Sequence, residues 1–162
     1  MDRKISLKYG LIAGGIVVLY FLLFYFLDKE SMLKIWVAYS SILIYVIFMG
    51  KAVSDQRNLR EDIISFRDAI SVAFLTFIIA NVSYYIFYFF ILKSDPELLE
   101  MLKQSTIGFY QKMGQDTTEI EKKFEVGFSS IILGFARSAI GGFILSVIIA
   151  ATMRRGIRLK GN

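Results

Sequence analysis

The residue whose chemistry stands out in this sequence is Arg137, because it is the only charged residue inside the last long apolar run. An ionisable side chain at membrane depth indicates a functional site, and a guanidinium group suits phosphate or carboxylate oxygens. About 20 residues are needed to span a bilayer, so counting back from Arg154 places Arg137 only about 5 Å below the outer surface. Three interpretations stay open: the side chain reaches up to the lipid headgroups, contacts polar groups in the bundle, or binds an anionic group of a lipid or amphiphile.

Three residues of another apolar run could meet Arg137. Counted from Asp68, they lie at a similar height in the membrane, and they are Asn81, Tyr84 and Tyr85. Together with Arg137 they form the candidate ligand-binding or lipid-binding site.

A stripe of small residues surrounds Arg137 at four-residue spacing. The stripe consists of Ser130, Gly134, Ser138, Gly142, Ser146 and Ala150. In a membrane, small residues at this spacing let two helix backbones approach closely. The stripe therefore predicts a helix-packing surface, used either within one bundle or between protomers.

Catalytic and metal chemistry have little support in the sequence. The chain has no cysteine and no histidine, which removes the thiol nucleophile, the commonest general base and the commonest metal ligand. Six of the seven carboxylates between the third and fourth apolar runs are candidates for a metal or acid–base site: Asp95, Glu97, Glu100, Glu119, Glu121 and Glu125. Their spacing is typical of a solvated helix face, and a hydrolase would need Glu119, Glu121 and Glu125 to converge on a cleft. We expect no catalytic residue, metal or cofactor.

Four long apolar blocks dominate the chain of 162 residues, of which 56% are hydrophobic. Their lengths predict membrane spans at about 9–27, 35–53, 69–92 and 130–152. The charged residues that give the chain its net charge of +5 lie at the ends of these blocks. Membrane topology explains this charge, so a nucleic-acid partner is not needed to account for it. The sequence thus predicts a single membrane domain, residues 1–162, that is all-α and forms a four-helix bundle.

The polar segment at about 95–127 is expected to hold an extra amphipathic, extracytoplasmic helix between spans 3 and 4. Asp95, Pro96 and Glu97 form a good helix start, with apolar residues following at helical spacing up to Gly114. A capping-box pattern at 118–121 then predicts a last helix that runs from Thr118 to Thr152.

Charge asymmetry predicts the orientation of the chain. With the N-terminus inside, the inner segments hold eleven Lys and Arg residues and the outer segments hold seven. The positive-inside tendency then places both termini in the cytoplasm.

The opening of the third block, Ser65-Phe66-Arg67-Asp68-Ala69-Ile70, its aromatic end, and the following Asp95-Pro96-Glu97 resemble a bacterial membrane family catalogued as domain of unknown function 4199. The resemblance implies a four-span protein of the bacterial inner membrane, with a long loop between helices 3 and 4. It implies no activity.

The leading functional hypothesis is a non-enzymatic inner-membrane scaffold or accessory subunit that packs with itself or with another membrane protein. The alternative is binding or transport of a lipid or amphiphile through a pocket near Arg137. Membrane lipids, a second copy of the chain or another membrane protein are the expected partners.

Overall fold

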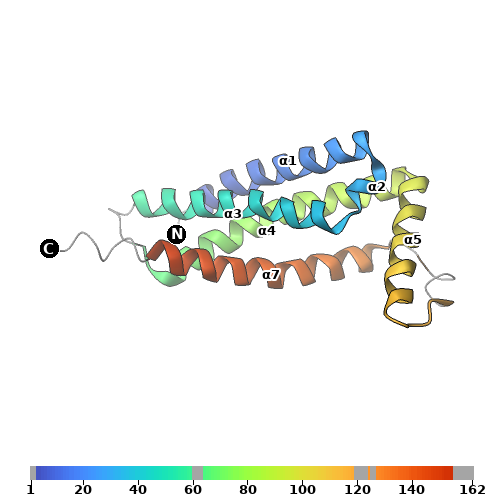
Figure 1. Ribbon diagram of the computed structural model, residues 1–162. Helices are drawn as coiled ribbons and strands as arrows, with labels where there is room; N and C mark the ends of the chain where they lie inside the picture. The colour runs from blue at the N-terminus through green and yellow to red at the C-terminus, as the bar shows by residue number, and fades with distance from the viewer. Residues whose placement is uncertain (1–2, 60–63, 119–123, 125–126, 155–162) are drawn as a thin grey trace.

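The computed structural model describes residues 3–59, 64–118, 124 and 127–154, and this part of the chain is all-helical (Figure 1). Four helices are long and apolar enough to cross a membrane. They are α1 (Arg3–Leu27), α3 (Ile35–Asn58), α4 (Phe66–Ser94) and α7 (Phe128–Arg154). Among the described residues, two further helices lie between them, α2 (Lys29–Met32) and α5 (Pro96–Lys112). The prediction of an all-α chain with four long apolar helices is confirmed.

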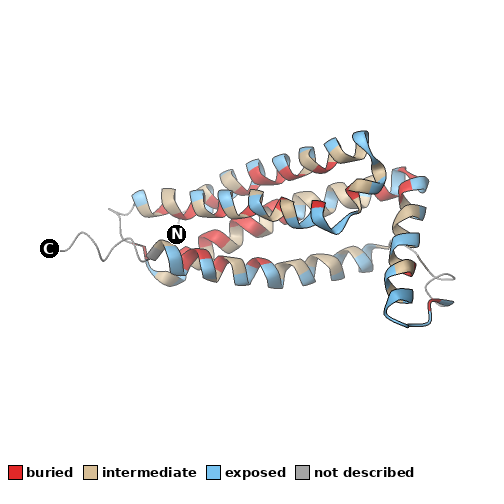
Figure 2. Ribbon diagram, in the orientation of Figure 1, coloured by how far each residue is buried: buried red, intermediate tan, exposed pale blue. Residues whose placement is uncertain are grey.

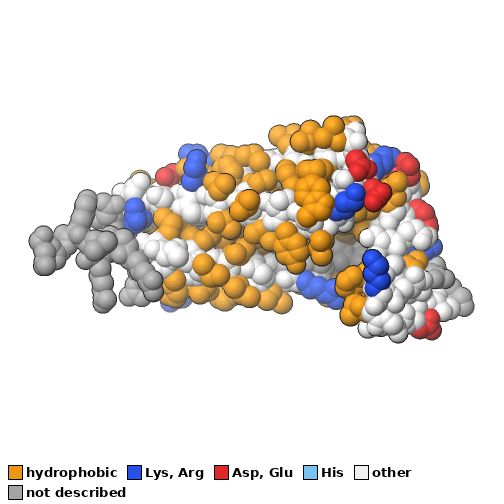
Figure 3. Space-filling view, in the orientation of Figure 1, with side chains coloured by type: hydrophobic (Ala, Val, Ile, Leu, Met, Phe, Trp, Pro, Cys, Tyr) orange, Lys and Arg blue, Asp and Glu red, His pale blue; other side chains and the backbone are white. Residues whose placement is uncertain are grey.

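Helix α4 is the centre of the bundle, because α1, α3 and α7 all pack against it. Its buried residues include Val72, Ala73, Thr76, Phe77 and Ala80, none of them more than 5% exposed. Buried residues line the inward faces of the long helices, and exposed residues line their outer faces (Figure 2). Those outer faces are covered by large hydrophobic side chains, as Figure 3 shows for one side of the molecule. This arrangement suits helices surrounded by lipid.

The contact between α1 and α4 depends on glycine. A Cβ atom added at Gly10 would lie 2.7 Å from the Cβ of Ile79, and one added at Gly14 would lie 2.7 Å from the Cβ of Ser83. One turn before Gly10, the buried Ser6 hydroxyl donates a hydrogen bond of 3.3 Å to the carbonyl of Val72. The two backbones are therefore so close that no larger side chain fits between them.

The small-residue stripe of α7 packs against α4 along most of its length. Gly142, Ser146 and Ala150 are buried, and a Cβ atom added at Gly142 would lie 2.2 Å from the ring of Phe77. A Cβ atom added at Gly134 would lie 3.1 Å from the ring of Tyr85. At the end of the stripe near α5, Ser130 is exposed. The stripe thus lies inside the bundle and leaves little small-residue surface for another protomer.

The predicted start of the last helix at Thr118 is wrong. Phe124 and Gly127 are not helical, and α7 begins at Phe128. The Gly127 carbonyl accepts the Ile131 amide at 3.3 Å and the Ser130 hydroxyl at 2.7 Å, so glycine occupies the capping position of the helix. Residues 119–121 of the predicted capping box lie outside the described residues.

Two long helices extend beyond their predicted spans. Helix α3 continues to Asn58, and α4 begins at Phe66, where the Ser65 hydroxyl accepts the amide of Asp68 at 3.1 Å. The hydrophobic pattern marks the part of a helix that suits hydrocarbon, whereas capping side chains set where the helix itself begins.

Helix α5 lies across one end of the bundle, at the end opposite the two termini (Figure 1). It begins at the predicted Asp95-Pro96-Glu97 sequence, and the Asp95 carboxylate accepts the Leu98 amide at 3.1 Å. Leu98 and Ile107 are the buried residues of α5. After the helix the chain turns at Gly114, whose positive φ of 72° favours glycine.

We predict that Gly142→Ala destabilises the bundle, because its new methyl group would overlap the ring of Phe77, which is only 5% exposed. Overpacking of this kind costs about 1–3 kcal/mol. Thermal unfolding in detergent measures the loss. Gly141→Ala is the matched control, since a Cβ atom there meets nothing within 4 Å. Equal stability of the two variants would contradict the close contact.

Candidate functional site

A polar clamp centred on Asp95 joins the bundle to α5. The Lys29 ammonium and the Tyr25 hydroxyl both bind Oδ2 of Asp95, each at 2.7 Å. Lys29 also pairs with the Glu97 carboxylate at 2.6 Å, and its ammonium lies 5.6 Å from the centre of the Tyr25 ring. The clamp therefore ties the end of α1 and the start of α2 to the first turn of α5.

The clamp keeps its charges over a wide pH range. The Lys29 ammonium, and next the Tyr25 hydroxyl, lower the pKa of Asp95 below its usual 3.8, while Asp95 and Glu97 raise the pKa of Lys29 above its usual 10.5. A lowered carboxyl pKa stabilises the folded state fully above about pH 4, and the effect is lost as pH falls through the folded pKa. A raised ammonium pKa stabilises the folded state fully below about pH 10. This stabilisation is lost as pH rises through the pKa of the folded state.

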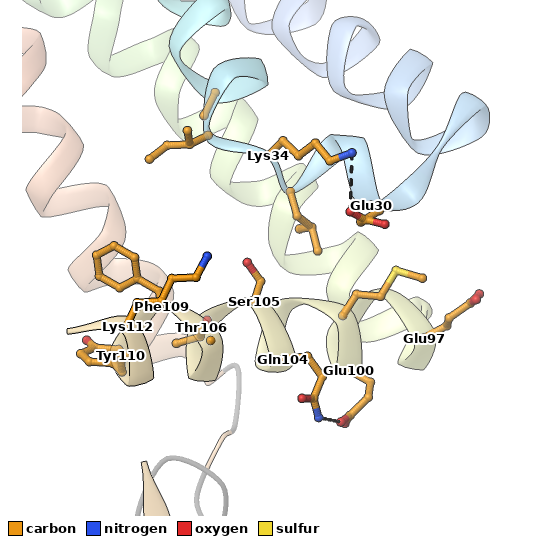
Figure 4. Close-up of a pocket in the computed structure, with 15 residues that line it drawn as sticks. Glu30, Lys34, Glu97, Glu100, Gln104, Ser105, Thr106, Phe109, Tyr110 and Lys112 are labelled. Atoms are coloured by element: carbon orange, nitrogen blue, oxygen red, sulfur yellow. Dashed lines mark hydrogen bonds and ion pairs between the residues drawn. The ribbon is translucent and has the colours of Figure 1, made fainter. Parts of the chain in front are cut away.

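Next to the clamp, an open groove runs between α5 and the corner where α2 meets α3. Figure 3 shows a recess between α5 and the long helices, and Figure 4 shows the lining of the groove. Its volume is about 1260 Å³, and its apolar lining comes from Leu33, Ile35, Ala38, Met101 and Phe109. This is the groove that we call the outer groove.

Charged side chains are distributed unevenly along the outer groove. Glu97 and Glu100 lie near the start of α5, whereas Lys112 lies in its last turn beside Phe109 (Figure 4). Lys34 lines the opposite wall and pairs with Glu30 at 3.5 Å. The groove thus has an acidic end near the clamp and a basic, aromatic end at the last turn of α5.

The predicted site residues on α4 form internal contacts of the bundle. The Asn81 amide donates to the Ser138 hydroxyl at 2.5 Å, which links α4 to α7. The Tyr84 ring packs on Phe21 of α1 at a centroid distance of 4.8 Å, and the Tyr85 ring packs on Phe135 of α7 at 5.9 Å. Asn81, Tyr84 and Tyr85 therefore bridge three helices.

Arg137 points away from those residues. Its neighbour Ser138 faces Asn81, and because successive residues of a helix are about 100° apart, Arg137 falls on the exposed side of α7. Within the described residues its side chain forms no hydrogen bond or ion pair. The structure does not bring Arg137, Asn81, Tyr84 and Tyr85 together around one described groove.

Comparison with known families places these features in context. The family profile described as "Protein of unknown function (DUF4199)" matches residues 8–155. The chain belongs to the DUF4199 family. No curated protein and no solved structure matches it. The matched region of this DUF4199 chain includes α5, the clamp and the outer groove.

In the described part of the DUF4199 chain, no group of three or more His, Cys, Asp or Glu residues is placed to hold a metal ion. Asp95 and Glu97 both point to Lys29 and serve the clamp. The three carboxylates that a hydrolase would need, Glu119, Glu121 and Glu125, lie outside the described residues.

Sequence reasoning missed the clamp and the outer groove of the DUF4199 chain. It identified Asp95 as a helix cap and as one of six candidate carboxylates, and it counted Lys29 and Lys34 only among the seven basic residues of the outer segments. One signal was available: Lys29 and Asp95 carry opposite charges at the same end of neighbouring spans. Their pairing becomes evident only when α1 packs on α4 in a known register.

We predict that Asp95→Asn loosens α5, because the amide keeps a capping oxygen but loses the charge that holds Lys29. Hydrogen exchange of the α5 amides should become several-fold faster. The control is Glu100→Gln, which removes a carboxylate of α5 outside the clamp; this carboxylate accepts only from Gln104 at 2.8 Å. Unchanged exchange in Asp95→Asn would show that the clamp does not hold α5.

Proposed function

We propose that this DUF4199 protein is a non-enzymatic, multi-pass membrane protein that binds a lipid or another amphiphile in the outer groove. The observation that carries the proposal is the mixed lining of this groove, with apolar side chains along its walls and charged groups at both ends. An amphiphile needs both surfaces at once.

We further propose that the protein resides in the bacterial inner membrane with both termini in the cytoplasm. Four long helices return the chain to the end at which it began (Figure 1). The excess of Lys and Arg in the segments at that end supports a cytoplasmic location for it. In this orientation α5 and the outer groove lie at the extracytoplasmic surface.

The position of the outer groove beside the membrane interface supports entry of an amphiphile from the bilayer. Trp36 and Tyr39 are 53% and 65% exposed on the first turns of α3, and aromatic side chains of this kind favour the interface between lipid and water. Ile35 and Ala38, which line the groove, lie on the same turns. An amphiphile whose headgroup occupies the groove could therefore leave its apolar part among the lipids.

The exposed position of Arg137 suits a contact with lipid headgroups. The residue lies only about 5 Å below the predicted outer surface, and its long stem allows the guanidinium group to reach that surface. We propose this anchoring role for Arg137.

We predict that Ala38→Trp blocks the outer groove, because a bulky ring would fill the wall opposite α5. Native mass spectrometry of the protein released from detergent should show several-fold less bound lipid. Ala151→Trp is the control, since Ala151 is also exposed on a long helix but lies far from the groove. Equal lipid retention by both variants would refute binding in the groove.

A second candidate, an accessory subunit or scaffold, is favoured by the outward face of α7. Only 11% of the residues in the most apolar stretch of α7 are buried, against 28% in each of the other three long helices. Ile140, Phe143 and Ile144 are all at least 48% exposed on this helix. A second copy of the chain or another membrane protein could cover that face.

Cysteine cross-linking in native membranes tests this second candidate, because the chain has no cysteine of its own. If α7 self-associates, Ile140→Cys should form a disulfide-linked dimer. Leu19→Cys on α1 is the control, since both side chains are 66% exposed. Equal cross-linking of the two variants, or none in either, would exclude self-association through this face.

A further inference from the structure

We infer that the amphiphile of the outer groove is an anionic membrane lipid, whose headgroup is held by Lys112 with help from Lys34. This inference rests on the proposed function and specifies its ligand. It depends on the distribution of charge along the groove and on the apolar surface beside the basic end.

Lys112 is the cation at the basic end of the groove. It lies in the last turn of α5, where the helix dipole favours a cation, and it forms no ion pair with any described residue. Figure 4 shows its ammonium group directed into the groove, and Phe109 lies one turn before it on the same wall. The Lys112 side chain is exposed, so its ammonium group is accessible to an anionic headgroup that enters the groove.

Two of the three acidic side chains that line the groove, Glu97 and Glu100, do not compete for this position. Glu97 is paired with Lys29. Glu100 precedes Lys112 by twelve residues, which is about 18 Å along a helix. A zwitterionic headgroup, with its two charges only a few ångströms apart, could not reach both Lys112 and Glu100. The basic end therefore favours a headgroup with net negative charge.

Lys34 is available as a second cation. Its ion pair with Glu30 is long, at 3.5 Å, and both side chains are exposed, by 43% and 72%. Lys34 also donates a hydrogen bond of 3.4 Å to the Ser31 hydroxyl. Exposed contacts of this kind are weak, so the long lysine side chain can turn to a phosphate oxygen. Lys34 and Lys112 lie on opposite walls of the groove (Figure 4).

The apolar walls indicate that the anion belongs to a lipid. Ile35, Ala38 and Phe109 line the groove together with the two lysines, and Leu43 continues the apolar surface along α3 with 65% of its surface exposed. A free phosphate ion would leave this surface in water, whereas an acyl chain would cover it.

The test compares phosphatidylglycerol with phosphatidylcholine. The full chain is reconstituted in nanodiscs that contain both lipids, and native mass spectrometry measures which lipid stays bound after release. We expect phosphatidylglycerol to be retained in preference, and Lys112→Gln to reduce its retention roughly tenfold, as expected for loss of one charged contact. Lys34→Gln should give a smaller decrease, and Lys112→Arg should restore binding.

The matched control is Lys103→Gln, because Lys103 lies on the same helix but lines a different groove, with Ile107 and Gln111. Thermal unfolding confirms that each variant is folded. A decrease with Arg137→Gln but not with Lys112→Gln would overturn the inference, because the decisive cation would then lie on α7. Binding of inorganic phosphate alone, with the same dependence on Lys112, would also overturn it.

Failure of this inference is distinguishable from failure of the proposed function. If both lipids are retained equally and Ala38→Trp abolishes both, the groove binds amphiphiles without selecting charge. If no lipid is retained in the groove of the wild-type protein, both proposals fail.

Discussion

The close approach of α1 and α7 to α4 is the contact on which the rest of the structure depends. In lipid, apolar side chains gain little by leaving one apolar surrounding for another, so helices associate through tight packing and buried hydrogen bonds. Gly10, Gly14 and Gly142 provide that packing, and the bond between Asn81 and Ser138 adds a polar link. These contacts fix the rotation and the height of each helix relative to α4.

The clamp depends on this register. Tyr25 lies near the end of α1, and Asp95 directly follows α4, so their side chains meet only when the two helices are aligned in height. Asp95 also caps α5, which means that one carboxylate both begins this helix and sets its direction. The outer groove exists because α5 is held at its first turn and crosses the end of the bundle without lying flat on α3.

The sequence predicts those features that depend on one segment at a time. The four spans follow from length and hydropathy, and the start of α5 follows from Asp95 and Pro96. The direction in which a residue faces depends on how helices rotate against each other, and hydropathy does not encode that rotation. For this reason the sequence predicts the height of Arg137 in the membrane but not the side of α7 on which it lies. The pairing of Lys29 with Asp95 was not foreseen for the same reason. The start of α7 was misjudged because the prediction relied on the capping pattern at 118–121 and did not consider Gly127 as a helix cap.

The central position of α4 also has a consequence for membrane insertion. The chain is made from its N-terminus, so α1 enters the membrane before the helix that covers its glycines has been synthesised. Until then, the backbone at Gly10 and Gly14 faces lipid or the insertion machinery. Helix α7 is made last of the four, and it joins a surface that α3 and α4 have already formed. The surface that covers the glycines of α1 is therefore available only after α4 has been synthesised.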